Sequence, residues 1–210
     1  LNAPLHDIKL PVFKSQAVYD SPAFQALQNM QDAVETKFLP TLNEDALVSV
    51  YEFHVENVAP NQVLPFTADR STTTDAINHI ERDFVGGFTG GSRAWDAVKL
   101  AAESFGTGTS ADEDRYILLF SDGNDTSSIA TVNDAVAAAK GRGIRVFTIA
   151  FGPSPNQTDL QTLVTNTNGL YLAAQDASQL QTNFAKIISD LQGQYVLRWA
   201  TLRRAGAADV

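Results

Sequence analysis

The stretch Arg115-Tyr-Ile-Leu-Leu-Phe-Ser-Asp-Gly-Asn-Asp125 decides the fold of this chain. Its apolar run, Ile117 to Phe120, stops at the turn residues that begin with Ser121. A continuous apolar run bounded by turn residues is typical of a strand that is covered on both faces, as in a parallel sheet. Ligands of open α/β sheets bind beyond the carboxyl ends of the strands, so Asp122 stands where such a fold keeps its functional residues. An Asp-Gly pair also simply forms turns, and this segment alone does not separate the two interpretations.

Strand-like and helix-like segments alternate along the rest of the chain. Short apolar runs predict strands at 8–13, 46–55, 115–120, 144–151 and 170–173. Apolar residues three and four apart predict the helices between them, for example the face formed by Phe24, Leu27, Met30, Val34 and Phe38. This order predicts an α/β fold, a Rossmann-like three-layer α/β/α sandwich with a mostly parallel central sheet. The segment from Asn57 to Phe66 contains two prolines and is expected to add one short antiparallel edge strand.

Capping residues predict helix starts at five places in the sequence. Serine, threonine and aspartate accept hydrogen bonds from the first free N–H groups of a helix, and an acidic or amide residue three positions later completes a capping box. The expected starts are Ser21 before Pro22, Thr72 with Asp75, Ser92, Thr131 with Asp134, and Thr158 with Gln161.

Composition limits the classes of function. The chain has 210 residues, and we expect one domain over residues 1–202 with a tail or linker at 203–210. Its net charge is −9, and because a phosphate-binding surface is basic, we expect no nucleic-acid partner. There is no cysteine, and no apolar stretch reaches the ~20 residues that span a bilayer. The first residue is Leu1, which suggests a piece of a longer precursor, and we expect an extracytoplasmic location (secreted, periplasmic or cell-surface).

Four segments together resemble the von Willebrand factor type A domain. They are Gly90-Gly-Ser-Arg-Ala-Trp-Asp-Ala97, Tyr116 to Asp125, Gly143-Ile-Arg-Val-Phe-Thr-Ile-Ala-Phe-Gly152 and Asn168-Gly-Leu-Tyr171. The resemblance extends from about residue 8 to residue 200. The segments Pro65 to Arg70 and Ser189 to Leu197 are similar, more narrowly, to the type A proteins that are frequent in acidobacteria. The order and spacing of the segments carry the assignment, because each is short.

This resemblance implies a metal-ion-dependent adhesion site. The family pattern is Asp-x-Ser-x-Ser after the first strand, a Thr in a Gly-Gly-Thr loop, and an Asp after a later strand. Ser92 falls at the Thr position and Asp122 at the last Asp position. Such a site holds Mg²⁺ or Ca²⁺ with few carboxylates, so that an acidic residue of a protein partner completes the coordination shell.

The first motif is absent, which makes the predicted site degenerate. One alignment leaves only Ser15 as a hydroxyl ligand beside Lys14, and another offers Asp20. Three interpretations remain open: the site binds no metal, it binds Mg²⁺ or Ca²⁺ weakly, or Asp20 restores it. Ligand number and charge set the affinity for hard cations, which favours the absence of a tight metal.

The sequence therefore predicts a non-catalytic, adhesion-type module that binds a protein partner at the strand-end loops. Phe88, Arg93, Asn124 and Asp125 are the candidate partner contacts, since aromatic and arginine residues dominate interface energetics. One alternative is a metal-free structural module of a larger exported protein. Another is a phosphotransfer enzyme that uses Asp122, but such enzymes need a lysine near a later strand end, and Gly152-Pro-Ser154 stands there instead.

Overall fold

A computed structural model gives the fold of the chain. The residues that it describes are 22–53, 59–83, 92–108, 113–121, 124–151, 157–174 and 177–192. The strand predicted at 8–13 and the segment after residue 192 lie outside the described residues.

The strands form two hydrogen-bonded groups. β3 (Arg115–Ser121), β4 (Ile144–Phe151) and β5 (Tyr171–Ala174) pair in parallel, in the order β3-β4-β5. β1 (Val48–Glu52) and β2 (Asn61–Thr67) form an antiparallel pair. The parallel group confirms the predicted main sheet, and β4 has the bounds that the sequence predicts. β2 is an antiparallel strand, as expected, but its seven residues make it longer than the prolines suggest.

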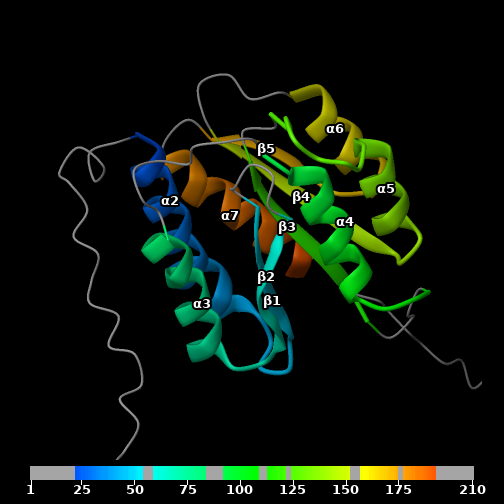
Figure 1. The fold of residues 1–210 in the computed structure, drawn as a ribbon. Coiled ribbons are helices and arrows are strands. Elements are labelled where there is room, and N and C mark those ends of the chain that lie inside the picture. The colour runs from blue at the N-terminus through cyan, green and yellow to red at the C-terminus, as the bar shows by residue number, and fades with distance from the viewer. Residues whose placement is uncertain are drawn as a thin grey trace, which may run out of the picture.

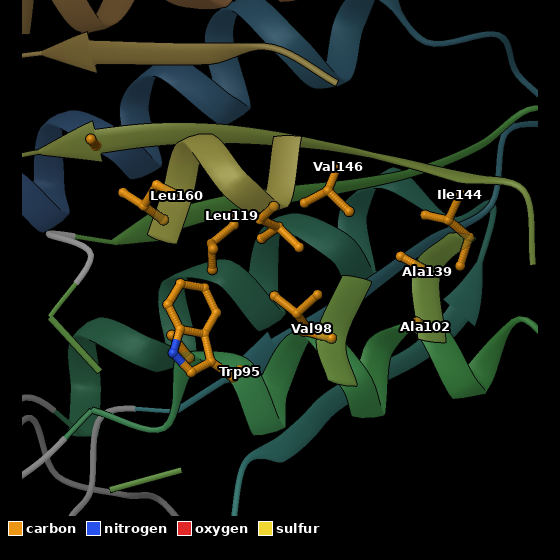
Figure 2. Close-up of a cluster of buried hydrophobic side chains, with 12 residues drawn as sticks. Trp95, Val98, Ala102, Leu119, Ala139, Ile144, Val146 and Leu160 are labelled. Atoms are coloured by element: carbon orange, nitrogen blue, oxygen red, sulfur yellow. The ribbon is translucent and has the colours of Figure 1, made fainter. Parts of the chain in front are cut away.

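Side chains alternate between the two faces of the parallel strands, and helices cover both. Leu119 of β3 and Ile144 and Val146 of β4 belong to one buried apolar cluster (Figure 2), and Ile117 of β3 packs against it. That cluster is completed by three helices on the same side of the sheet (Figure 1): α4 (Ala94–Ser104), α5 (Val132–Lys140) and α6 (Gln157–Asn166). Leu118, Phe120, Phe147 and Ile149 point to the opposite face.

The second face is covered by the N-terminal and C-terminal helices. These are α2 (Pro22–Ala33), which continues as a short π-helix (Val34–Phe38) and a short 3₁₀ helix (Leu39–Thr41), α3 (Arg70–Asp83) and α7 (Ala177–Gln192). Phe184 of α7 is fully buried there and packs on Phe120 at 5.5 Å between ring centroids. The apolar face predicted for α2 is confirmed, because Phe24, Leu27 and Val34 are buried. Two covered faces give the three-layer α/β/α sandwich that the sequence predicts.

One glycine allows a close approach between the turn before β5 and the neighbouring strand β4. A Cβ on Gly169, in the turn before β5, would lie 1.7 Å from the carbonyl oxygen of Val146. Only a residue without a side chain fits there, since real Cβ atoms do not approach backbone oxygen so closely. The glycine therefore fixes the path by which the chain enters β5.

The helix starts agree with the sequence in part. Pro22 is the first residue of α2, as predicted, and the capping box of Thr131 and Asp134 at α5 is confirmed. The predicted starts at Thr72 and Thr158 are wrong, because both residues lie inside helices that begin earlier. At α3 the capping residue is Asp69, whose carboxylate accepts hydrogen bonds from the backbone N–H groups of Ser71 and Thr72 and from the Thr72 hydroxyl.

Candidate functional site

Two segments far apart in sequence meet beyond the carboxyl end of β3. The carbonyl oxygen of Ser92 accepts hydrogen bonds from the N–H groups of Thr126, at 3.1 Å, and Ser127, at 3.0 Å. The N–H of Ser92 donates in return to the Thr126 hydroxyl, at 3.0 Å. We call residues 92–96 and 124–131 the strand-end rim. The sequence predicts that the loops before α4 and after β3 converge, and these contacts join them directly.

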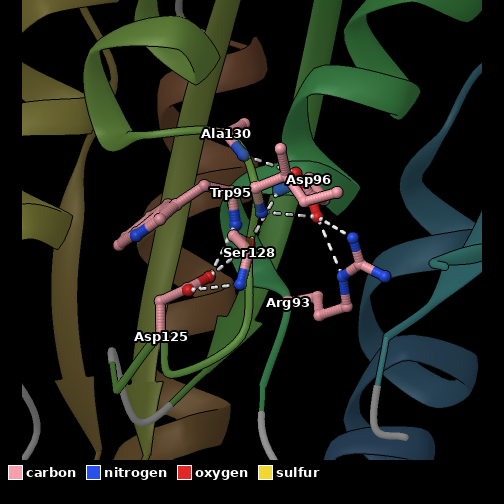
Figure 3. Close-up of polar contacts among 7 residues, drawn as sticks. Arg93, Trp95, Asp96, Asp125, Ser128 and Ala130 are labelled. Atoms are coloured by element: carbon pink, nitrogen blue, oxygen red, sulfur yellow. Dashed lines mark hydrogen bonds and ion pairs between the residues drawn. The ribbon is translucent and has the colours of Figure 1, made fainter. Parts of the chain in front are cut away.

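Asp125 holds the start of α4 from across the rim (Figure 3). Its Oδ2 accepts a hydrogen bond from the N–H of Trp95 at 3.0 Å and from the Ser128 hydroxyl at 2.6 Å, while its Oδ1 accepts from the N–H of Ser128 at 3.0 Å. The Ser128 hydroxyl oxygen accepts in turn from the N–H of Asp96, at 3.1 Å. The first N–H groups of a helix have no partner within it, so these two side chains act as its cap. The expectation that Ser92 caps α4 is wrong: the N-cap residue is Arg93, which makes no capping side-chain bond.

Asp96 makes the reciprocal connection, from the helix to the loop. Its Oδ1 accepts from the N–H of Ala130 at 2.8 Å, and its Oδ2 accepts from the N–H of Ile129 at 3.1 Å. The guanidinium of Arg93 pairs with the same Oδ2, at 2.6 Å from Nη2 and 2.8 Å from Nε. The side chains of Arg93 and Asp96 are only 11% and 13% exposed, so this ion pair is largely shielded from water.

The environment of Asp96 favours its charged form. Burial acts to raise the pKa of Asp96, but hydrogen bonds from the N–H groups of Ala130 and Ile129, together with the Arg93 guanidinium, outweigh it and lower the pKa. Asp134, in the capping box of α5, also has a lowered pKa, chiefly because the backbone and hydroxyl of Thr131 donate to it. Both carboxylates are therefore ionised at neutral pH, and each already has its donors within the protein.

This arrangement suits a fixed surface better than a reactive centre. The carboxylates of Asp96 and Asp125 are occupied by N–H, O–H and guanidinium donors, which leaves neither as a free base or nucleophile. A divalent cation would have to compete with those donors and with the positive charge of Arg93. Within the described ranges, no three His, Asp or Glu side chains gather closely enough to hold a metal ion. The described part of the rim thus does not fit the implied cation by itself.

Four of the predicted site residues lie outside the described residues: Ser15, Asp20, Phe88 and Asp122. The other four, Ser92, Arg93, Asn124 and Asp125, all lie on the strand-end rim. Asn124 is exposed, whereas Asp125 and Ser92 are partly buried. Arg93 and Asp125 are engaged within the molecule, which assigns them a positioning role in addition to any partner contact.

Sequence reasoning missed Asp96, Thr126 and Ser128. Asp96 carried a readable signal, since it lies three residues after Arg93 and in the first turn of a predicted helix, where an acidic residue is favourable. Thr126 and Ser128 carried none beyond their residue type. Their roles depend on a tertiary contact more than thirty positions away in the chain.

The comparisons with known proteins identify the family and the fold. The sequence profile of the von Willebrand factor type A domain matches residues 15–186. No curated protein matches the chain. Of its helices, none in the described ranges is long and apolar enough to cross a membrane.

Solved structures with a similar fold include three informative ones. The conserved hypothetical protein BatB from Bacteroides thetaiotaomicron has a TM-score of 0.63 at 19% identity, over 80% of this chain and 89% of that one. A von Willebrand factor type A protein from Catenulispora acidiphila has a TM-score of 0.63 at 16% identity, over 85% of this chain and 41% of that one. Proximal thread matrix protein 1 from the mussel byssus has a TM-score of 0.62 at 20% identity, over 84% of this chain and 44% of that one.

At these identities the structural likeness shows the fold, and the profile shows the family. The profile match spans far more than half of the chain, and its bounds include β1 to β5 and the whole strand-end rim. The chain therefore belongs to the von Willebrand factor type A domain family.

Proposed function

We propose that this chain is a non-catalytic module that binds a protein partner at its strand-end rim. Type A domains are generally protein-interaction modules. The observation that carries the proposal is the network of hydrogen bonds that joins residues 92–96 to residues 124–131. A loop surface that is already ordered loses little conformational entropy on binding, which favours recognition.

The same network argues against catalysis at the described rim. Its two carboxylates have their oxygens occupied by donors, and a general base or nucleophile needs an available lone pair close to a substrate. The phosphotransfer alternative uses Asp122 with Asp125 as a second carboxylate, and both oxygens of Asp125 already accept hydrogen bonds. It predicts that a beryllofluoride or acyl-phosphate reagent modifies Asp122, and we expect no modification.

A weak cation site at Asp122, Ser92 and either Ser15 or Asp20 stays part of the proposal. Titration with Mg²⁺, Ca²⁺ or Mn²⁺ tests it, because a ligand that binds only the native state raises the melting temperature. We expect no increase at micromolar ion and at most a small one at millimolar ion. A rise of several degrees at micromolar ion would contradict the degenerate site.

A rim variant tests the proposal of partner binding. Asn124→Arg places a long charged side chain on the exposed part of the rim, and Gln181→Arg places the same side chain on the exposed side of α7. We expect protein partners captured by the wild-type chain to be lost with Asn124→Arg and retained with Gln181→Arg, as measured by quantitative mass spectrometry. Equal capture of partners by all three proteins would refute the proposal. So would unchanged capture by Asp122→Ala and Ser92→Ala at every Mg²⁺ and Ca²⁺ concentration.

We also propose an extracytoplasmic location, secreted, periplasmic or cell-surface. One solved structure with the same fold is entitled an aerotolerance-related membrane protein from Bacteroides fragilis, with a TM-score of 0.58 at 18% identity. Type A domains often act outside the cell. Protease accessibility of the protein in intact cells of its source tests this location.

A further inference from the structure

Ile129 is the most exposed large apolar side chain in the described part of the molecule, at 87% exposure. It lies on the wall of a shallow depression of about 550 Å³ beside the strand-end rim. Leu100 of α4, which is 37% exposed, lines the same depression, and so does Pro60, the residue before β2. The depression therefore brings apolar groups from three separate parts of the chain to one place on the surface.

The exposure of Ile129 is built into the backbone. Its N–H and that of Ala130 donate to the two carboxylate oxygens of Asp96, and the preceding N–H, of Ser128, donates to Asp125. On the other side, Thr131 starts α5 with its capping box. These bonds fix the main chain before, at and after the isoleucine, so the side chain cannot turn inward by a simple loop movement. An apolar group held outward in this way loses little entropy when a partner covers it.

Four charged residues border the depression, and three of them are satisfied within the molecule. Arg93 and Asp96 form their ion pair, and Asp134 accepts two hydrogen bonds from Thr131. Lys99 is exposed and lowers the pKa of Asp134 by its charge, but it makes no hydrogen bond or ion pair with the described residues. Among the described residues on this border, the charged group without a hydrogen bond or ion pair is therefore a cation.

We propose that this depression, which we call the Ile129 depression, binds an extended segment of a protein partner that carries an apolar side chain next to a carboxylate. The apolar side chain packs between Ile129 and Leu100, and the carboxylate pairs with the ammonium group of Lys99. A second copy of this chain is the less favourable occupant, because two chains of charge −9 repel one another. The inference rests on the proposed function and specifies where on the rim the partner binds and with which chemistry.

A random peptide library displayed on phage provides the probe. Selection on the wild-type chain is expected to enrich peptides that pair a Leu, Ile, Met or Phe with an adjacent Asp or Glu. Binding of the enriched synthetic peptides is then measured on three variants. Ile129→Ser is expected to weaken binding at least tenfold, because it removes the central apolar contact. Lys99→Ala is expected to weaken it about threefold, since an exposed ion pair contributes little to binding. Leu47→Ser, at another exposed apolar residue, 62% exposed, is expected to change nothing.

The outcomes separate this inference from the proposed function. If the peptides bind Ile129→Ser as tightly as wild type but do not bind Asn124→Arg, the Ile129 depression is not the binding site. The proposal of partner binding at the rim would then stand. Enriched peptides without a carboxylate, or no enriched peptide, would overturn the partner chemistry. If the wild-type chain self-associates in analytical ultracentrifugation and Ile129→Ser does not, a second copy of the chain is the occupant. That result would also overturn the proposed partner segment. Failure of both Ile129→Ser and Asn124→Arg to alter any binding would overturn both proposals.

Discussion

Helices α4 and α5 both begin at the strand-end rim, but their first turns are capped in opposite ways. At α5, Thr131 and Asp134 satisfy each other's backbone N–H groups within four residues of sequence. At α4 the N-cap residue makes no capping side-chain bond, and the free N–H groups of Trp95 and Asp96 donate instead to Asp125 and Ser128. The cap of α5 consists of residues at its own start, whereas the cap of α4 comes from a loop about thirty residues later in the chain.

The difference shows how the rim is made rigid. A local cap stabilises only its own helix, whereas a cap from another segment also fixes the loop that supplies it. Asp96 returns the contact, from α4 to the loop at Ile129 and Ala130. Asp125 thus accepts a hydrogen bond from α4, and Asp96 of α4 accepts hydrogen bonds from the loop before α5. These reciprocal bonds fix the two segments to one another.

The largest effect is expected from Asp96→Ala. This change leaves the N–H groups of Ile129 and Ala130 without their acceptor and leaves the shielded Arg93 guanidinium without its partner. We expect the free energy of unfolding to fall by about 3 kcal/mol. Chemical denaturation measures it, and a loss below about 1 kcal/mol would mean that the helix-to-loop contact is dispensable.

Asp125→Ala is expected to have the next largest effect. It removes the acceptor for the N–H of Trp95 and two contacts of Ser128, and we expect a loss of about 2 kcal/mol. Asp125→Asn retains one oxygen acceptor and serves as the matched control, with a smaller loss. Equal stability of Asp125→Ala and wild type would contradict the cap that α4 takes from the loop.

Thr131→Ala tests the local cap and is expected to cost about 1 kcal/mol. Because the capping box acts within α5, the change should leave the contacts between α4 and the loop intact. In a double-mutant cycle, Thr131→Ala and Asp125→Ala should therefore be nearly additive, whereas Asp96→Ala and Asp125→Ala should not. Strong coupling between Thr131 and Asp125 would remove the distinction between the two caps.

The smallest expected effect is a pH dependence. The pKa of Asp96 is lowered in the folded state, below the value near 3.9 that is usual for an unfolded chain. Its contribution is therefore fully present above about pH 5 and is lost as the pH falls below about 4, through the folded pKa. Denaturation between pH 7 and pH 3 should show a shallower acid loss for Asp96→Asn than for wild type. Identical pH profiles would exclude Asp96 as a source of acid sensitivity.

The sequence predicts what is local and periodic. Apolar runs identify β3 and β4, helical spacing identifies the buried face of α2, and the Thr131–Asp134 pair identifies the start of α5. Prediction from sequence fails where the hydrogen-bond partner is distant in the chain. The sequence predicts Ser92 as the cap of α4, but the loop residue Asp125 accepts the hydrogen bond from this helix. At α3 the cap is Asp69, three residues before the predicted Thr72.

The candidate site was likewise predictable in place but not in its contacts. The family resemblance directs attention to Ser92 and the loop after β3, and the structure joins these segments through Thr126 and Ser127. Asp96 escaped notice because its role requires the loop to fold back over α4. Exposed apolar residues such as Ile129 cannot be recognised from sequence, since nothing in a three-residue neighbourhood shows which way a side chain points.

Amide hydrogen exchange at Ile129 and Ala130 tests most directly whether the strand-end rim is one rigid surface. Their N–H groups lie in an irregular loop, but both donate to Asp96. In the wild-type chain we predict that they exchange as slowly as the amides in the middle of α4, and that Asp96→Ala makes them exchange much faster while α4 stays protected. Exchange at the rate of an unstructured peptide in the wild-type chain would contradict the account.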